Sequence, residues 1–178
     1  MASCSIPYKV FYRNVKYPRL EFKTGKLIII LPPGQEPYPL LDKYRHWINK
    51  QFNFIKGCID ETKAKKLINR TEEDFKALIY QITNEVSHEL RVKFNRIYFR
   101  KMKTKWASLS PARNLTINRL MKYLPEHLIR YVIFHEMAHL VEKRHNGKFW
   151  EIVSRKFSNY QELERELFIY WFLILELL

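Results

Sequence analysis

Four polar side chains in the segment FHEMAHLVEKRH (134–145) have the types and spacing of a metal site with its own base: His135, Glu136, His139 and His145. Residues four apart stand one above the other on a helix, so His135 and His139 can offer two imidazole nitrogens to one ion, at about 2.0–2.1 Å each for zinc. Glu136 is rotated by about 100° from His135, close enough to take a proton from a water on that ion. His145 is the candidate third ligand, and three ligands leave a fourth position open for water.

Two alternatives to this metal site stay open at the level of sequence. The motif can be a helix with two surface histidines and a solvated glutamate, but the apolar residues around it and the chain turn expected at Asn146–Gly147 favour a site. The third ligand also has rivals, which are Glu142, Glu151 and Glu162. Glu142 lies three residues past His139 and would need no turn, but we expect it to pair with Arg144 or Lys143 instead.

Composition sets the class of protein that carries these residues. The chain has 178 residues and is 47% hydrophobic, so it can bury a core and is not a disordered protein. Its formal net charge of +14 indicates an anionic partner or an acidic substrate. A lysine-rich surface on an ordinary protein is the alternative. Cys4 and Cys58 are far apart and form no CxxC pattern, and no apolar leader opens the sequence, so we expect a soluble protein of the reducing cytoplasm. The apolar run from Leu167 is too short for a membrane span, which needs about 20 residues.

Hydrophobic patterning divides the chain into four consecutive segments. These are N-terminal strands (1–35), a helical segment (38–95), the segment that carries the motif (96–157) and a C-terminal helix (158–178). No repeat, low-complexity stretch or clear linker separates them. The pattern therefore predicts a single domain of α+β class over residues 1–178.

Local signals predict where the elements begin and end. A Thr24–Gly25 turn between apolar runs predicts a hairpin or three-stranded meander. Gly57 is expected to end the first helix, and Thr71 with Asp74 forms a capping-box pattern at the start of the next. Pro125 opens the helix that carries the motif, at a position where its missing N–H costs nothing.

The segment HEMAHLVEKRHNGKFW resembles the HExxH-x5-H-x3-FW signature of the YgjP-like zinc metallopeptidases, relatives of the WLM and SprT-type proteases and of the minimal zincins. The resemblance extends upstream through KMKTKWASLSPARNLTINRLMKYLPEHLIRYVIFHE and, more loosely, to the N-terminal strands that end in LPPG. It implies a zincin-like fold, in which a small antiparallel or mixed sheet packs against the motif helix. It also implies one Zn²⁺ per chain, held by His135, His139 and His145, with Glu136 as the general base.

Two departures from the family pattern concern turns rather than ligands. Ala107 and Leu109 stand where the family usually has glycine and cysteine, so a role for that turn is open. Glu142 replaces the metzincin-type glycine, so the turn to the third histidine must use another geometry. Phe149 and Trp150, which follow that histidine, are expected to pack in the core rather than form a shelf for substrate.

The resemblance also implies a substrate-binding strand. In zincins of this kind the strand beside the cleft pairs with an extended substrate, which by resemblance gives this role to Asn114, Leu115, Thr116 and Ile117. An ordinary sheet strand, with Leu115 and Ile117 facing the core, is the alternative. Arg119 and Tyr123 are nearby donors for an oxyanion, although nothing in the sequence singles out either.

A basic stretch over residues 91–125 suggests a second class of function. It has ten lysines and arginines and no acidic residue, interleaved with Phe94, Tyr98, Phe99 and Trp106. This composition is typical of a nucleic-acid surface, although alternation on a solvated sheet face explains it equally. The alternative function is therefore a nucleic-acid-associated zinc protein, either a protease acting on DNA-bound proteins or a non-catalytic binding module. An open coordination position argues against the module, because structural zinc usually has four protein ligands.

The ends of the chain leave two further questions. The C-terminal helix can pack on the domain or form a homodimer contact, or instead lie on a membrane surface or plug the cleft of a latent form. Cys4 can be a latency thiol on the metal, although a free terminal residue is the simpler interpretation.

Taken together, the sequence predicts a zinc metallopeptidase of the cytoplasm. This hydrolase would cleave peptide bonds of a protein or peptide substrate through a zinc-bound water activated by Glu136.

Overall fold

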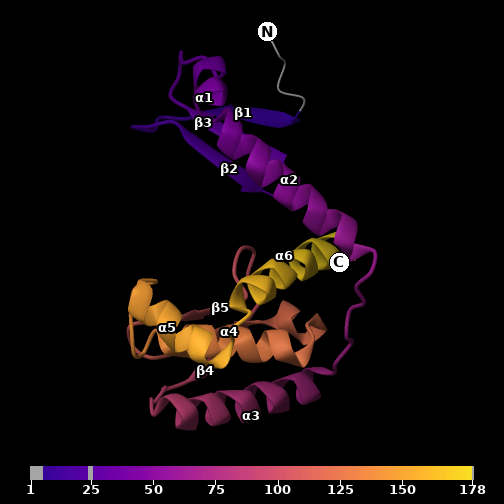
Figure 1. Ribbon diagram of the computed structural model, residues 1–178, viewed down its shortest axis with the longest axis vertical. Helices are drawn as coiled ribbons and strands as arrows, with labels where there is room; N and C mark the ends of the chain where they lie inside the picture. The colour runs from indigo at the N-terminus through magenta and orange to yellow at the C-terminus, as the bar shows by residue number, and fades with distance from the viewer. Residues whose placement is uncertain (1–5, 24–25, 178) are drawn as a thin grey trace. The chain divides into compact units, whose positions relative to one another are not determined.

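The computed structural model describes residues 6–23 and 26–177 of the chain (Figure 1). Cys4 and the predicted Thr24–Gly25 turn lie outside the described residues. The described elements mix helices with two small sheets, which confirms the predicted α+β class.

Contacts within the chain divide it into two compact units, Met1–Ala64 and Lys65–Leu178. Each unit is described by itself. The prediction of a single domain over residues 1–178 stays a prediction.

The first unit contains a three-stranded mixed sheet and two helices. Strand β3 (Lys26–Leu31) lies in the middle, parallel to β1 (Tyr8–Tyr12) and antiparallel to β2 (Arg19–Lys23). Helices α1 (Tyr38–Lys43) and α2 (Arg45–Thr62) follow. The buried cluster of this unit is formed by Ile6, Leu27, Ile29, Leu31, Leu41 and Ile48.

The prediction that Gly57 ends the first helix is wrong, because α2 continues to Thr62. A glycine inside a helix costs only about 0.8–1.0 kcal/mol relative to alanine. The neighbouring Ile55 and Cys58 are buried on α2, and their burial outweighs that local penalty.

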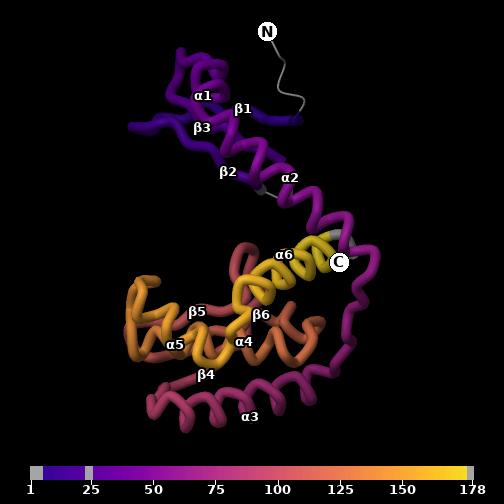
Figure 2. Tube along the Cα trace, in the orientation of Figure 1, coloured from indigo at the N-terminus to yellow at the C-terminus, as the bar shows by residue number. Residues whose placement is uncertain are grey.

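The second unit contains a long helix, a three-stranded sheet and three further helices (Figure 2). Its elements before the motif are α3 (Glu72–Leu90), β4 (Ile97–Arg100), β5 (Ala107–Leu109), β6 (Leu115–Asn118) and the 3₁₀ helix η1 (Arg119–Tyr123). Those that follow are α4 (Glu126–Ala138), α5 (Gly147–Lys156) and α6 (Tyr160–Leu177). Strand β6 is central: it pairs with β4 in parallel and with β5 in antiparallel fashion.

The helix starts in this unit follow the local signals. Thr71 precedes α3 in extended conformation, and its hydroxyl oxygen accepts the Asp74 N–H at 3.1 Å, as the capping-box pattern predicts. Pro125 stands immediately before α4, which confirms the predicted start. Arg91, in left-handed conformation (φ 54°), ends α3.

Helix α4 is the centre of the second unit. It contacts α3, β5, α5 and α6, and α3 runs beside it in both ribbon and trace (Figures 1 and 2). Most of its residues after the first turn are buried: Leu128, Ile129, Tyr131, Val132, Ile133, Phe134, Met137 and Ala138. A helix that is apolar on most sides needs neighbours on most sides, so the core of this unit holds the motif helix in place.

The buried side chain of Asn118 fixes the loop between β4 and β5. Its amide nitrogen donates to the carbonyls of Met102 (2.9 Å) and Lys105 (2.7 Å), while its oxygen accepts the N–H groups of Met102 and Leu120. Four backbone groups are thus satisfied by one side chain, which determines where β5 begins.

Within the described ranges, none of the helices combines the length and the apolar character needed to cross a membrane.

Candidate metal centre and active site

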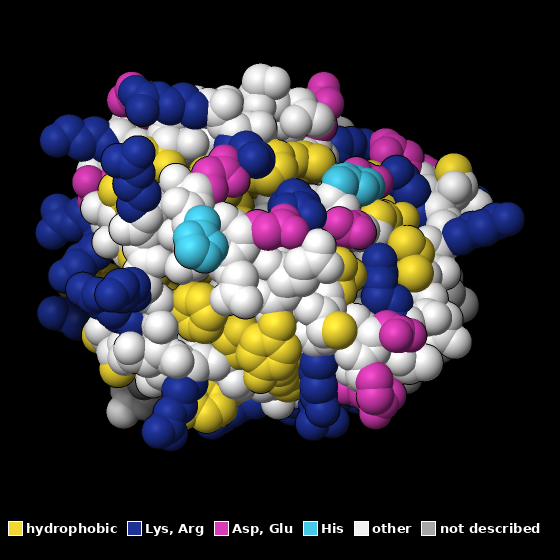
Figure 3. Space-filling view, turned by 90° about the horizontal axis from the view of Figure 1, so that it is seen from below, with side chains coloured by type: hydrophobic (Ala, Val, Ile, Leu, Met, Phe, Trp, Pro, Cys, Tyr) yellow, Lys and Arg dark blue, Asp and Glu magenta, His cyan; other side chains and the backbone are white. Residues whose placement is uncertain are grey.

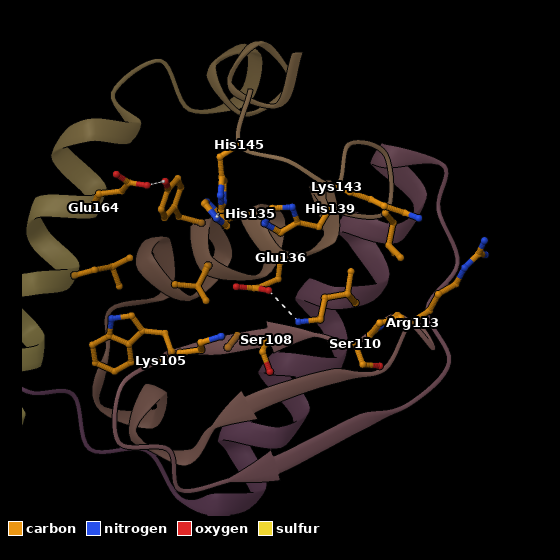
Figure 4. Close-up of a pocket in the computed structure, with 18 residues that line it drawn as sticks. Lys105, Ser108, Ser110, Arg113, His135, Glu136, His139, Lys143, His145 and Glu164 are labelled. Carbon is orange, nitrogen blue, oxygen red and sulfur yellow. Dashed lines mark hydrogen bonds between the residues drawn. The ribbon is translucent and has the colours of Figure 1, made fainter. Parts of the chain in front are cut away.

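Three imidazoles meet at one point of the second unit. His135, His139 and His145 each offer a ring nitrogen, and these nitrogens all lie within 4.8 Å of one another. The Nε2 atoms of His135 and His145 are 3.0 Å apart. Figure 4 shows the three rings converging above the carboxylate of Glu136.

The chain brings His145 back toward α4 by ending one helix and capping the next. Helix α4 ends at Ala138, and His139 keeps a helical conformation as its C-cap, so the spacing of four from His135 holds. After a short turn, the side-chain oxygen of Asn146 accepts the N–H of Phe149 at 3.1 Å and caps α5. The imidazole directly before this cap thereby faces the motif helix, as the predicted break required.

Two aromatic rings orient the imidazoles. Phe149, fully buried, stacks on His139 (centroids 4.6 Å apart, 24°) and meets His135 and His145 edge-on at 5.0 and 4.6 Å. Trp150 stacks on His145 at 5.7 Å. Neither ring lines the adjoining cavity, so the predicted packing role is confirmed, and the packing surface includes the histidines themselves.

A backbone carbonyl selects the tautomer of His139. Its Nδ1 lies 3.2 Å from the carbonyl oxygen of Glu142, and because a carbonyl only accepts, Nδ1 carries the proton. The Nε2 lone pair is then free for a metal, the arrangement typical of histidine ligands.

Electrostatics keep His135 neutral. Burial, with the neighbouring imidazoles of His145 and His139, lowers the pKa of His135 to about 4. Neutral imidazole is the form that binds a metal, so little proton competition remains near neutral pH. Three imidazole nitrogen donors with room for a fourth ligand fit Zn²⁺.

The carboxylate rivals for the third ligand position have other partners. Glu142 accepts the backbone N–H of Arg144 at 3.2 Å, and Glu151 pairs with Arg155 at 2.5 Å. Across the part of the chain that the structure describes, the three histidines are the group of ligand-type residues able to hold a metal ion.

Glu136 lies beside the histidine cluster and is held by strand β5. Its Oε2 accepts the N–H of Leu109 at 3.0 Å (Figure 4). Burial raises the pKa of Glu136 above its ordinary value, against the opposing effects of the Leu109 hydrogen bond and of the charges of Lys105 and His145. A carboxyl group whose pKa is raised toward neutrality is suited to accept and return a proton.

An open cavity of about 860 Å³ exposes this cluster to solvent. Its wall combines β5 and the loops on either side of it with α4 and α6. Polar or charged side chains in the wall include those labelled in Figure 4: Lys105, Ser108, Ser110, Arg113, Lys143 and Glu164.

The strand that borders this cavity is β5 and not β6, which the sequence predicted to pair with substrate. The backbone of Leu115, Thr116 and Ile117 in β6 is paired with β4 on one side and β5 on the other. Neither these residues nor Asn114 line the cavity. The strand predicted to pair with substrate thus has no free backbone edge over these residues, and Leu115 and Ile117 are core residues. The sequence could not reveal this order, because β4 and β6 are neighbours in the sheet although β5 lies between them in the sequence.

The cavity wall also contains a pair that the sequence analysis missed. The hydroxyl of buried Tyr131 donates to Glu164 Oε1 at 3.0 Å, and its ring meets His135 edge-on. Burial and this carboxylate raise the pKa of Tyr131, so it stays a donor. Tyr131 lies four residues before His135, a spacing that could have indicated it. Arg119 and Tyr123, considered for an oxyanion, do not line the cavity.

Comparison with known families agrees with this geometry. The family described as YgjP-like, metallopeptidase domain, matches residues 53–169, which is more than half of the chain. The chain belongs to the YgjP-like metallopeptidase family. A comparison with curated proteins gave no match.

Two solved structures are similar to parts of this YgjP-like chain. One is the crystal structure of the metallopeptidase zymogen of Pyrococcus abyssi abylysin, with 22% identity, 50% of this chain and 90% of that chain covered, and a TM-score of 0.47. The other is that of the metallopeptidase zymogen of Methanocaldococcus jannaschii jannalysin, with 31% identity, 56% and 97% covered, and a TM-score of 0.46.

Family membership confirms the predicted class of enzyme. The YgjP-like protein is a metallopeptidase, a hydrolase that depends on a metal, typically zinc, and acts on proteins or peptides.

Proposed function

We propose that His135, His139 and His145 hold one zinc ion per chain and that Glu136 is the general base of peptide-bond hydrolysis. A zinc ion bound there would supply a Lewis acid that polarises the substrate carbonyl and lowers the pKa of a water to about 7. The observation that carries this proposal is the convergence of three imidazole nitrogens within 4.8 Å, in the wall of the same open cavity as the half-buried carboxylate of Glu136.

The residues of the chain have separate tasks in this mechanism. Glu136 takes the proton of the attacking water and then gives it to the leaving amine. The N–H of Leu109 fixes one carboxylate oxygen, which leaves the other for the proton. Phe149 and the Glu142 carbonyl hold the imidazoles in orientation, so the donor set is formed before any ligand arrives.

The substrate would be an extended peptide segment beside β5. This strand is at the edge of its sheet, and it lines the cavity next to Glu136. Main-chain pairing with such an edge gives affinity without sequence preference. The role assigned to residues 114–117 from the sequence thus passes to residues 107–109.

Elemental mass spectrometry and a proteolysis assay on the full chain test this proposal. Wild type should bind close to one zinc, His135→Ala should lose it, and Glu136→Gln should keep it while losing hydrolysis by more than about a hundredfold. Glu142→Gln is a matched control, because it neutralises a nearby carboxylate that lies outside the cavity wall. Zinc uptake by His135→Ala equal to that of wild type, or unchanged hydrolysis by Glu136→Gln, would contradict it.

The predicted further partners have weaker support. Within residues 91–125, Phe94, Phe99 and Trp106 pack against the core, and Tyr98 is the interleaved aromatic left exposed (37%), so few rings are free to stack on bases. Lys and Arg side chains do gather toward one end of the face in Figure 3. Nucleic-acid binding stays a prediction, whether by a protease acting on DNA-bound proteins or by a non-catalytic binding module. The salt dependence of DNA affinity tests it. The homodimer through α6 and the cytoplasmic location also stay predictions.

A further inference from the structure

Two exposed cations line one end of the cavity. Arg113 and Lys143 come from the loop after β5 and from the turn after α4, and both are exposed. Among the side chains that the structure describes, neither forms an ion pair. A third cation of the wall, Lys105, acts electrostatically on Glu136 instead.

The backbone at Arg113 is unusual. Its φ of 58° lies in the left-handed region, which glycine and asparagine tolerate best. Both its backbone groups are bonded: the N–H donates to the Ser110 carbonyl at 2.9 Å, and the carbonyl accepts the Asn95 N–H at 2.8 Å. A long charged side chain is therefore held by a fixed turn at the cavity edge, which is the kind of conformational cost that accompanies a functional site.

The carboxylates of the wall lie elsewhere. Glu136 is the proposed base at the centre, and Glu164 accepts from Tyr131 at the other end (Figure 4). Along α4, Tyr131 and His139 are eight residues apart, or about 12 Å. The cavity is therefore polarised, with Arg113 and Lys143 beyond His139 and Glu164 on the side of Tyr131.

The direction of β5 orients a bound peptide along this axis. The Trp106 carbonyl accepts the N–H of Asn118 and so points toward β6, whereas the Leu109 N–H points to Glu136. Backbone groups alternate along a strand, so those of Ala107 and Leu109 face the cavity. Antiparallel pairing is the more stable mode. In that mode the N-terminal side of the substrate lies near the end of β5 and Arg113, and its C-terminal side lies toward Glu164.

We propose that the enzyme selects substrates with acidic side chains on the N-terminal side of the cleaved bond, where Arg113 and Lys143 receive them. This inference rests on the proposed function for the position of the cleaved bond, but not for the binding of acidic peptides. Two exposed cations at one end of a cavity, with no ion pair among the described side chains, provide a site for carboxylates. The preference should weaken as salt is raised, because exposed charges are screened.

The test uses the full zinc-loaded chain in two assays. In the first, the inactive Glu136→Gln variant is titrated into a Glu-rich peptide and its Gln counterpart, each carrying an uncharged dye, and binding is followed by fluorescence anisotropy. In the second, the wild type digests a complex peptide mixture and the cleaved bonds are mapped by mass spectrometry. Both are repeated with Arg113→Gln/Lys143→Gln and with the control Lys56→Gln/Lys76→Gln, which removes two exposed charges that do not line the cavity.

We expect the Glu peptide to bind about tenfold more tightly than the Gln peptide, and Asp and Glu to be enriched before the cleaved bond. The cavity variant should lose both effects and the control should keep them. Cleavage without acidic preference would overturn this inference and leave the proposed function intact. Selective binding of the Glu peptide without any cleavage by wild type would support the inference while contradicting the proposed function. An oligonucleotide that displaces the Glu peptide and binds more tightly would overturn this inference and identify nucleic acid as the ligand of the two cations.

Discussion

At the scale of single residues, the site depends on side chains that would not touch the metal. Phe149 packs against all three imidazoles, and one carbonyl determines the tautomer of His139. Such neighbours fix ring directions, and losing them typically costs about 10- to 100-fold in metal affinity. The motif residues are therefore necessary for the site but do not define its geometry alone.

The Tyr131–Glu164 pair should couple α4 to α6. Tyr131→Phe removes one hydrogen bond to a carboxylate and should lower the free energy of unfolding by about 1–2 kcal/mol. Urea unfolding of Tyr131→Phe, Glu164→Gln and the double variant measures the coupling, which should exceed about 0.5 kcal/mol. Additive single effects would show that the contact contributes nothing to stability.

Glu166 should make stability depend on pH. Burial opposes its ionisation, but hydrogen bonds from Lys65 (2.6 Å) and His127 (3.0 Å) outweigh burial, so the pKa of Glu166 is lowered. A carboxyl group whose pKa is lower in the folded than in the unfolded chain stabilises the fold at pH values above its unfolded pKa of about 4.3. This contribution is lost as the pH falls through the folded pKa. The free energy of unfolding of wild type should exceed that of Glu166→Gln by up to about 1 kcal/mol at pH near 6, and this difference should disappear in acid. A gap that widened on acidification in thermal unfolding would contradict this.

At the scale of elements, the loop before β5 depends on Asn118. Asn118→Ala would leave four backbone groups without their partner and should cost about 2–4 kcal/mol. Because the same loop leads into β5, hydrolysis should fall as well. Asn95→Ala is the matched control, since that exposed side chain makes one bond, to the Ala112 carbonyl. Equal losses in chemical denaturation of the two variants would contradict the special role of Asn118.

How far the sequence predicted these elements depends on the range of the interactions involved. The Thr71 cap, the Pro125 helix start and the turn at Asn146 are local, and each was predicted from neighbouring residues. The three histidines were found because helical spacing and one turn relate them. The edge position of β5 and the Tyr131–Glu164 contact depend on chain order in a sheet and on the packing of α6, and no local pattern encodes either.

At the scale of the whole molecule, charge and core size distinguish the parts of the chain. The net charge of +14 favours encounter with anionic substrates, consistent with the cations at the cavity. Among the described residues, the buried cluster around α4 is several times larger than that of the first unit. Local unfolding should therefore be easier in the first unit, because fewer buried contacts oppose it.

Zinc should accordingly stabilise one unit and not the other. Without metal, amides of β1–β3 should exchange with deuterium faster than those of α4, whose residues are mostly buried. A ligand present at about 1,000 times its Kd adds about 4 kcal/mol to the state that binds it, so zinc should slow exchange in α4 and α5, which flank the three histidines. Hydrogen-exchange mass spectrometry with and without zinc measures this, and His135→Ala is the control that should abolish the response. Slower exchange confined to β1–β3, or a response that persists in His135→Ala, would place the metal elsewhere in the chain.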